Sequence, residues 1–188
     1  MKNKIYGKGI YQKGIYQKGK YNSTSPAYKK WTGMLNRCYN KKFIKDNPWY
    51  KNCKVDEEWL YFEKFAEWYE ENKVEGFDLE LDKDILKKGN RVYSSENCLL
   101  VPKEVNLFYR FLQGKSLILP TGIKVISSNN FQVRINMEDG LYIRKFEILE
   151  LAVHCIYEMK KKRANELAIK YKDCLRDDVY SKLINFKD

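Results

Sequence analysis

Three short runs of alternating apolar and polar residues constrain this chain most, because alternation has the period of a β-strand. The runs lie at about residues 123–125, 131–136 and 141–144, with turn-forming residues between them. Directly after them, apolar residues recur at helical spacing over about residues 147–171. This part of the chain is therefore predicted to form a three-stranded meander followed by a long helix.

The first half of the chain follows helical spacing instead. Ser25-Pro26 is a favourable helix start, because serine can cap a helix and proline suits its first turn, and a break is expected near Asp46-Asn47-Pro48. An amphipathic helix rich in aromatic residues is predicted over about residues 56–71, with its acidic side chains in solvent. The expected fold class is α+β, with a helical N-terminal half and a sheet near the C-terminus.

Charge is divided unevenly along the chain. Residues 1–54 hold 14 Lys or Arg and one acid, which gives +13, whereas residues 55–84 carry −9 and residues 85–188 carry +7. A strongly basic segment favours a polyanionic partner, since phosphate contacts dominate affinity for nucleic acid. The alternative is a solvated basic tail. No apolar stretch approaches the roughly 18 residues of a spanning helix, and the first residues, MKNKIYGKGIYQKG, lack the apolar run of a signal peptide. We therefore expect a cytoplasmic location and no membrane partner.

The N-terminal residues 1–25 contain a short repeat. IYQKG occurs at 10–14 and again at 15–19, and tyrosines recur every five residues. Five is the period of neither a helix nor a strand, and the glycines oppose a regular helix, so an extended or partly disordered arm is expected. Two interpretations stay open: the tyrosines and lysines contact nucleic acid, or the tail packs its tyrosines on its own domain.

The cysteine pattern indicates reduced, mostly buried thiols, because the count is odd and no CxxC occurs. A structural zinc is an open alternative for three of the five. The cysteines are Cys38, Cys53, Cys98, Cys155 and Cys174, of which the first three are the zinc candidates.

Asp82, Asn97 and Asn106 are the residues most suited to chemistry. Residues 78–106 follow the pattern strand, loop, strand, helix, in which a strand presents Asp82 and a short helix presents Asn106. Oxygen ligands of this kind suit a hard cation such as Mg²⁺, which can polarise a scissile phosphate. Asn97, in the connecting turn, can hold the loop by side-chain hydrogen bonds to the backbone.

The run LDKDILKKGNRVYSSENCLLVPKEVN resembles the ββα-metal finger of phage-type HNH endonucleases. The preceding segment, WTGMLNRCYN … YKNCKVDEEWLYFEKFAEW, is similar to the upstream half of those proteins, and together the resemblance covers roughly residues 26–108. It implies that Asp82 is the first acidic metal ligand, that Asn97 pins the loop and that Asn106 is the last ligand. The implied cofactor is Mg²⁺ or Mn²⁺.

Lys83 departs from this family, which usually keeps a water-activating histidine at that position. A lysine side chain is ordinarily protonated at neutral pH and is then no base, whereas Asp84 could accept a proton weakly. The single histidine, His154, lies about 50 residues beyond the finger and is expected to be an ordinary residue of the long helix. The candidate catalytic residues are Lys83, Asp84 and Asn97, and the candidate metal ligands are Asp82 and Asn106.

The C-terminal run from GIKVISSNNFQVRINMEDGLYIRKFEI through the long helix resembles the three-strand-plus-helix DNA-binding domain of plant ethylene-response factors. That resemblance implies a sheet laid in the major groove. Arg144-Lys145 departs from it, replacing a usual Leu-Gly, and a small sheet–helix module with solvated arginines is the alternative. By alternation, one face should carry Gln132, Arg134, Tyr142 and Arg144, opposite Phe131, Val133 and Ile143. With the finger half included, the expected DNA-contact residues are Arg37, Arg91, Gln132, Arg134, Tyr142 and Arg144.

Three domains follow from these patterns: a basic arm at 1–25, an HNH-like nuclease domain at 26–112, and a sheet-plus-helix DNA-binding domain at 113–188. The expected function is a metal-dependent endonuclease that cleaves or nicks double-stranded DNA, of a phage homing type, acting in a bacterial host cell. The alternative is a catalytically silent DNA-binding protein, a phage regulator or an inhibitor of a host system with a host protein as partner. RNA binding is a third hypothesis.

Overall fold

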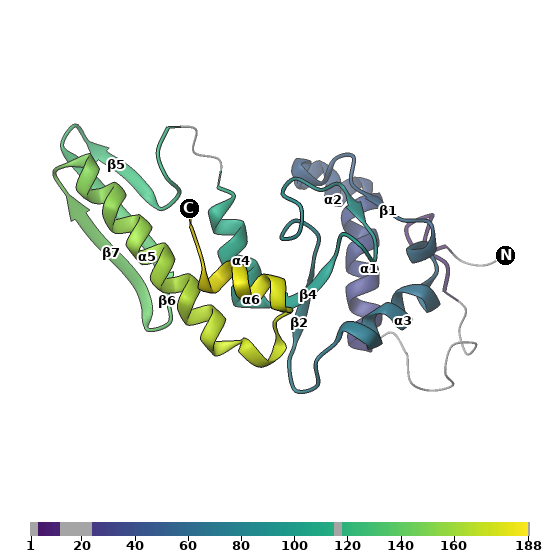
Figure 1. Cartoon of the computed structure of the whole chain (residues 1–188). Coiled ribbons are helices and arrows are strands. Elements are labelled where there is room, and N and C mark those ends of the chain that lie inside the picture. The colour runs from purple at the N-terminus through teal and green to yellow at the C-terminus, as the bar shows by residue number, and fades with distance from the viewer. Residues whose placement is uncertain (1–3, 12–23, 115–117, 188) are drawn as a thin grey trace. The chain divides into compact units, whose positions relative to one another are not determined.

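The computed structural model describes residues 4–11, 24–114 and 118–187 and divides the chain into two compact units, Met1–Val101 and Pro102–Asp188. Helices and small sheets are mixed throughout (Figure 1), which confirms the α+β class. Among the described residues, no helix combines the length and apolar character needed to cross a membrane. Part of the predicted arm, residues 12–23, lies outside the described residues.

The first unit is built on helices with an aromatic core. Ser25 caps the first helix by accepting a hydrogen bond from the Tyr28 amide at 3.3 Å, which confirms the predicted helix start. Trp31 is fully buried and donates its indole N–H to the Trp59 carbonyl at 2.8 Å, and Phe62 and Phe65 complete the core. The helical segments are α1 (Pro26–Tyr39), α2 (Lys41–Asp46), η1 (Pro48–Tyr50), η2 (Glu58–Leu60) and α3 (Phe62–Asn72).

The predicted helix over residues 56–71 begins later than expected. Residues 58–60 form a short 3-10 helix, and Tyr61 is extended, with φ −91° and ψ 123°. Tyr61 pairs with Ile10 in an isolated parallel bridge, and this pairing interrupts the helix before α3 starts at Phe62. The spacing of aromatic residues alone gave no sign of that bridge.

Two small sheets complete the first unit. β1 (Lys54–Val55) pairs in parallel with β3 (Val92–Tyr93), and β2 (Leu79–Asp82) pairs with β4 (Leu99–Pro102). The order of β2, loop and β4, followed along the chain by α4 (Lys103–Leu112), agrees with the predicted strand, loop, strand and helix. The β1–β3 pairing was not predicted, because two-residue strands carry no measurable alternation.

The second unit is the predicted meander with its helix. β5 (Ile123–Ser127), β6 (Asn130–Met137) and β7 (Gly140–Phe146) form an antiparallel sheet with β6 at its centre. The long helix α5 (Leu149–Lys170) runs along one face of this sheet (Figure 1) and packs mainly on β6. The chain ends with η3 (Lys172–Cys174) and α6 (Asp177–Ile184), which packs on α5.

Charged side chains tie three elements of the second unit together. Arg163 of α5, only 8% exposed, bonds Glu104 of α4 at 2.6 Å and Glu138 of the β6–β7 turn at 2.9 Å. Lys170 bonds the same two carboxylates, at 2.9 and 2.7 Å. Two cations shared between two acids from different elements fix α4 and the turn against α5.

Candidate functional site

The loop that follows β2 begins with a buried aspartate. One Asp82 carboxylate oxygen accepts the backbone N–H groups of Asp84 and Ile85, each at 2.7 Å. An aspartate that accepts from residues two and three positions later stabilises a tight turn. Burial raises the pKa of the Asp82 carboxyl, and these two backbone hydrogen bonds oppose the rise.

Lys83 turns inward from this loop. Its ammonium donates to both Asp84 carboxylate oxygens at 2.8 Å and to the Asn90 carbonyl at 2.8 Å, and its side chain is 8% exposed. The same ammonium lies 5.8 Å from the centre of the Tyr93 ring. These partners use the three N–H donors of a lysine as a cation. Lys83 is therefore positioned to hold the loop closed.

Asn90 organises the other end of the loop, and its role was not anticipated. Its side-chain amide donates to the carbonyls of Lys83 and Val92 at 3.0 and 2.7 Å, and its side-chain oxygen accepts the Val92 amide at 3.0 Å. In the sequence, Lys88-Gly89-Asn90 has only the pattern of a turn. Gly89 has φ +74°, as such a turn requires. An asparagine directly after it was the available signal that the side chain caps the backbone.

Asn97 lies in the turn before β4. Its side-chain amide donates to the Ser94 hydroxyl at 2.8 Å, and its backbone amide contacts the same hydroxyl at 3.3 Å. The expected side-chain bonds to backbone are thus replaced by a bond to another side chain. Next to it, burial raises the pKa of the Cys98 thiol to about 12, so this thiol is protonated and inert at neutral pH.

The expected metal ligands come from different units. Asp82 belongs to the first unit, whereas Asn106 is a buried residue of α4 in the second. Within the first unit, Lys83 occupies both Asp84 oxygens and two backbone amides occupy one Asp82 oxygen. These donors do not by themselves fit a divalent cation, because an ammonium already neutralises the loop, and a metal-bound state stays a prediction.

The cysteines form no metal centre within the described residues. No group of three or more His, Cys, Asp or Glu side chains in residues 4–11, 24–114 and 118–187 is arranged to hold a metal ion. The five cysteines, all of them described, are free thiols, and only Cys155 is not buried, as the sequence indicated.

The strand register of the second unit corrects the expected sheet faces. Val133 lies directly opposite Arg144, Ile135 opposite Tyr142, and Arg134 opposite Ile143. Directly paired residues share a face, so Tyr142 and Arg144 lie on the side of buried Val133, and the Tyr142 hydroxyl contacts Cys155 of α5 at 3.4 Å. The prediction that Arg144 and Tyr142 share a face with Gln132 and Arg134 was wrong. Alternation assigns faces within one strand, whereas the turn at residues 138–139 sets the register between strands.

The face of the sheet away from α5 is basic. Of its strand residues, three are cationic and none is acidic, and all are exposed apart from the half-buried Asn130 and Gln132. This open face consists of Lys124, Asn130, Gln132, Arg134, Asn136, Leu141, Ile143 and Lys145. Lys124 and Lys145 were missed because they become neighbours of Gln132 only through the register.

The remaining expected DNA contacts, Arg37 and Arg91, lie in the first unit. Arg37, on α1, is half-buried with its guanidinium 5.6 Å from the centre of the Tyr93 ring. Arg91 is exposed but donates to the carbonyls of Trp49 and Lys51 at 2.6 and 3.2 Å. Both guanidinium groups already have contacts inside the unit. His154 is exposed on α5, in the element where it was expected.

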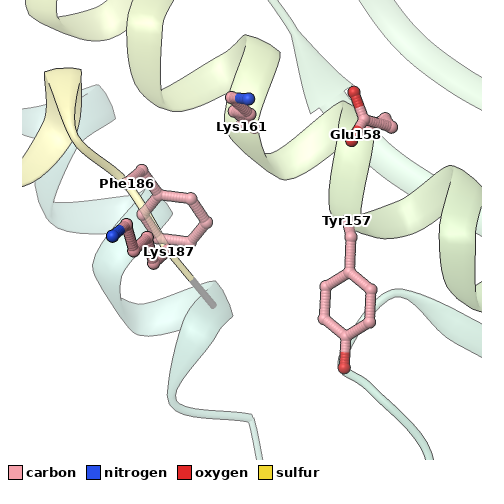
Figure 2. A pocket seen from close by; sticks show the side chains of 5 residues that line it. All are labelled: Tyr157, Glu158, Lys161, Phe186 and Lys187. Carbon is pink, nitrogen blue, oxygen red and sulfur yellow. The ribbon is translucent and has the colours of Figure 1, made fainter.

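A pocket of about 220 Å³ lies in the second unit between α5 and the segment after α6. Figure 2 shows Tyr157, Glu158 and Lys161 on the helix, with Phe186 and Lys187 on the C-terminal segment. Phe186 also packs on Phe108 of α4 at 5.7 Å between ring centres. The lining has one acid and two lysines, which is no recognisable catalytic arrangement.

No family model, no curated protein and no solved structure matches this chain.

Proposed function

We propose that this chain binds double-stranded DNA through the open face of the β5–β6–β7 sheet. The observation that carries the proposal is the exposed set of cationic and amide side chains on a sheet backed by α5. A sheet can enter the major groove, where Arg pairs with guanine and Gln or Asn with adenine. The resemblance of this segment to ethylene-response-factor domains supports the same surface.

The ion pair of Lys83 favours a protein that binds DNA and either does not cleave it or cleaves it slowly. At the position where HNH enzymes usually keep the water-activating histidine, Lys83 is a buried ion-pair partner of Asp84. General-base catalysis is commonly worth about 10²–10⁴-fold, so its loss alone leaves a slow enzyme. Such a protein would act by occupying DNA, as a regulator does, or by engaging a host protein.

DNA binding is tested by fluorescence anisotropy with a labelled duplex at several salt concentrations. We expect Arg134→Ala, on the open face, to weaken binding, and Arg144→Ala, on the helix side of the sheet, to weaken it less. Equal weakening by the two variants would show that the open face is not the specific DNA interface. An unchanged affinity in both variants would show that the sheet does not contact DNA.

The endonuclease is the second candidate, favoured by the position of Asp82 at the end of β2 and by the loop that Asn97 and Ser94 close. Supercoiled plasmid is incubated with Mg²⁺ or Mn²⁺ and with the native protein, Lys83→His or Asp82→Ala. Cleavage that Lys83→His raises and Asp82→Ala abolishes supports a nuclease. Inactivity of all three, with DNA binding intact, supports the silent protein.

A further inference from the structure

Residues 5–11 dock onto the helices of the first unit. Ile5 and Gly9 exchange backbone hydrogen bonds at 2.9 and 2.8 Å, which closes a small hairpin. Ile10 then donates to the Leu60 carbonyl at 2.7 Å and accepts from the Phe62 amide at 3.0 Å. The Tyr11 ring packs on Tyr28 and Phe62, at 5.2 and 5.4 Å between ring centres. The N-terminal docking site consists of Tyr28, Trp31, Leu35, Leu60 and Phe62.

Gly9 fills the tightest point of this docking site. It is buried, and an added Cβ would overlap Leu35 Cδ1 and lie 3.0 Å from two atoms of the Trp31 ring. Both neighbours are fully buried, so glycine is the residue that fits without displacing them, and a larger residue forces Leu35 and Trp31 to shift. The docking site therefore requires glycine, then a residue that pairs with Leu60 and Phe62, then an aromatic ring against Tyr28.

The chain contains this requirement twice. The heptapeptide Lys-Gly-Ile-Tyr-Gln-Lys-Gly occupies residues 8–14 and occurs again, residue for residue, at 13–19. We propose that the docking site accepts either copy, so that the N-terminus has two alternative registers five residues apart, with Gly14-Ile15-Tyr16 replacing Gly9-Ile10-Tyr11. A third register is excluded, since Gly19 is followed by Lys20 where an apolar residue packs.

Chain length permits the second register. Tyr11 contacts Tyr28 in the first turn of α1, so the end of the docked segment lies beside the start of that helix. With Tyr16 in the place of Tyr11, residues 17–27 would close the loop to Tyr28. An extended chain spans roughly 3.3 Å per residue, so eleven residues are ample for a closure between touching side chains.

The hairpin turn favours the first register. Tyr6 and Gly7 both have left-handed backbone angles, with φ 49° and 73°. In the second register Tyr11 takes the place of Tyr6 unchanged, but Gln12 takes the place of Gly7. A left-handed conformation costs an L-residue about 1–2 kcal/mol relative to glycine, which corresponds to about five- to thirtyfold in population. The second register is thus a minor state, and it frees Lys4 and Lys8 from the docked hairpin.

Valine at the tight glycine tests the exchange in the full chain. We expect Gly9→Val to raise the unfolding equilibrium constant by only about five- to thirtyfold, because the second copy takes over docking. Gly14→Val alone should change it less than twofold. The double variant should lose clearly more than the product of the two single effects. If the double variant equals Gly9→Val, the second copy does not dock, and if Gly9→Val changes nothing, the docking site does not require glycine; either result overturns the proposal.

Glutamine-to-glycine changes give a second test that does not depend on stability. Gln12→Gly removes the backbone penalty of the second register and makes the two registers about equally populated, so trypsin cleavage at Lys8–Gly9 in the native protein should rise about three- to fifteenfold. Gln17→Gly is the control. Gln17 would occupy the position of Gly7 only in the excluded third register, so this change should have no effect. Equal cleavage in both variants would overturn the proposal, as would a rise that depends on protein concentration, since that indicates exchange between chains.

Discussion

The loop between β2 and β3 and the open face of the β5–β6–β7 sheet use the same kinds of residue in opposite ways. In the loop, Lys83 is 8% exposed and donates hydrogen bonds to the Asp84 carboxylate and the Asn90 carbonyl. On the sheet, Arg134 and Lys145 are exposed and have no acidic neighbour on their face. A cation whose hydrogen bonds are used internally stabilises the fold, whereas cations gathered on an open face are available to a partner.

The sequence predicted both a chemical site in the loop and a DNA-binding surface on the sheet. In the structure, the polar groups of the loop form hydrogen bonds with one another. The sheet was expected to contribute arginines on one face, yet its register gathers lysines there as well.

Lys83→Met should have the largest effect on stability. It removes the donor from the Asn90 carbonyl and from the Asp84 carboxylate, and the loss should be about 2–3 kcal/mol of unfolding free energy. Urea unfolding followed by tryptophan fluorescence measures it. Lys88→Met, an exposed lysine of the same loop, is the control and should change stability by less than about 0.5 kcal/mol. Similar losses of unfolding free energy in both variants would show that the contacts of Lys83 do not stabilise the fold.

Arg134→Ala should act on binding and leave folding alone. If Arg134 contacts a base, as the proposed function requires, the loss is about 1–3 kcal/mol of binding free energy with relaxed sequence preference. The unfolding free energy should change by less than about 0.5 kcal/mol, because the side chain is exposed. Anisotropy titrations on several duplex sequences measure the first quantity and urea unfolding the second. Uniform weakening on every sequence would instead assign Arg134 to phosphate.

The fold was largely predictable and the site was not. Local periodicity identified α1, the meander and α5, because each of these elements shows its buried face over several turns or strand pairs. Periodicity could not give the β1–β3 pairing, the Ile10–Tyr61 bridge or the register that places Arg144 beside Val133, since these are contacts between distant segments. The sequence likewise located Lys83 but could not show that Asn90 and Asp84 would enclose it.

Glu104→Gln should produce a smaller, pH-dependent effect on the second unit. Burial alone would raise the pKa of Glu104, but hydrogen bonds from Lys170, Tyr171 and Arg163 outweigh it and lower that pKa to about 2. A carboxyl with a lowered pKa stabilises the fold above its unfolded pKa, and this contribution is lost as the pH falls from about 5 to 2.

Solvent screens the effect of Glu104, whose side chain is 37% exposed, so we expect about 1 kcal/mol. Thermal unfolding of the native protein and of Glu104→Gln between pH 2 and pH 5 measures it, and the variant should show the weaker pH dependence. Glu150→Gln, an exposed acid on α5, is the control and should follow the native curve. Parallel curves for all three proteins would show that the contacts of Glu104 contribute no net stability.

Lys124→Ala should have the smallest effect, visible mainly in the salt dependence of binding. Lys124 lies opposite Gln132 on the open face, and a lysine without a carboxylate on its own face is suited to contact a phosphate. Each phosphate contact contributes about 0.9 to the slope of log K against log salt. Removing Lys124 should therefore reduce the slope by about that amount while sequence preference is kept. Lys161→Ala removes the same charge from α5, away from the open face, and should leave the slope unchanged; if the two variants reduce it equally, net charge and not the sheet surface governs binding.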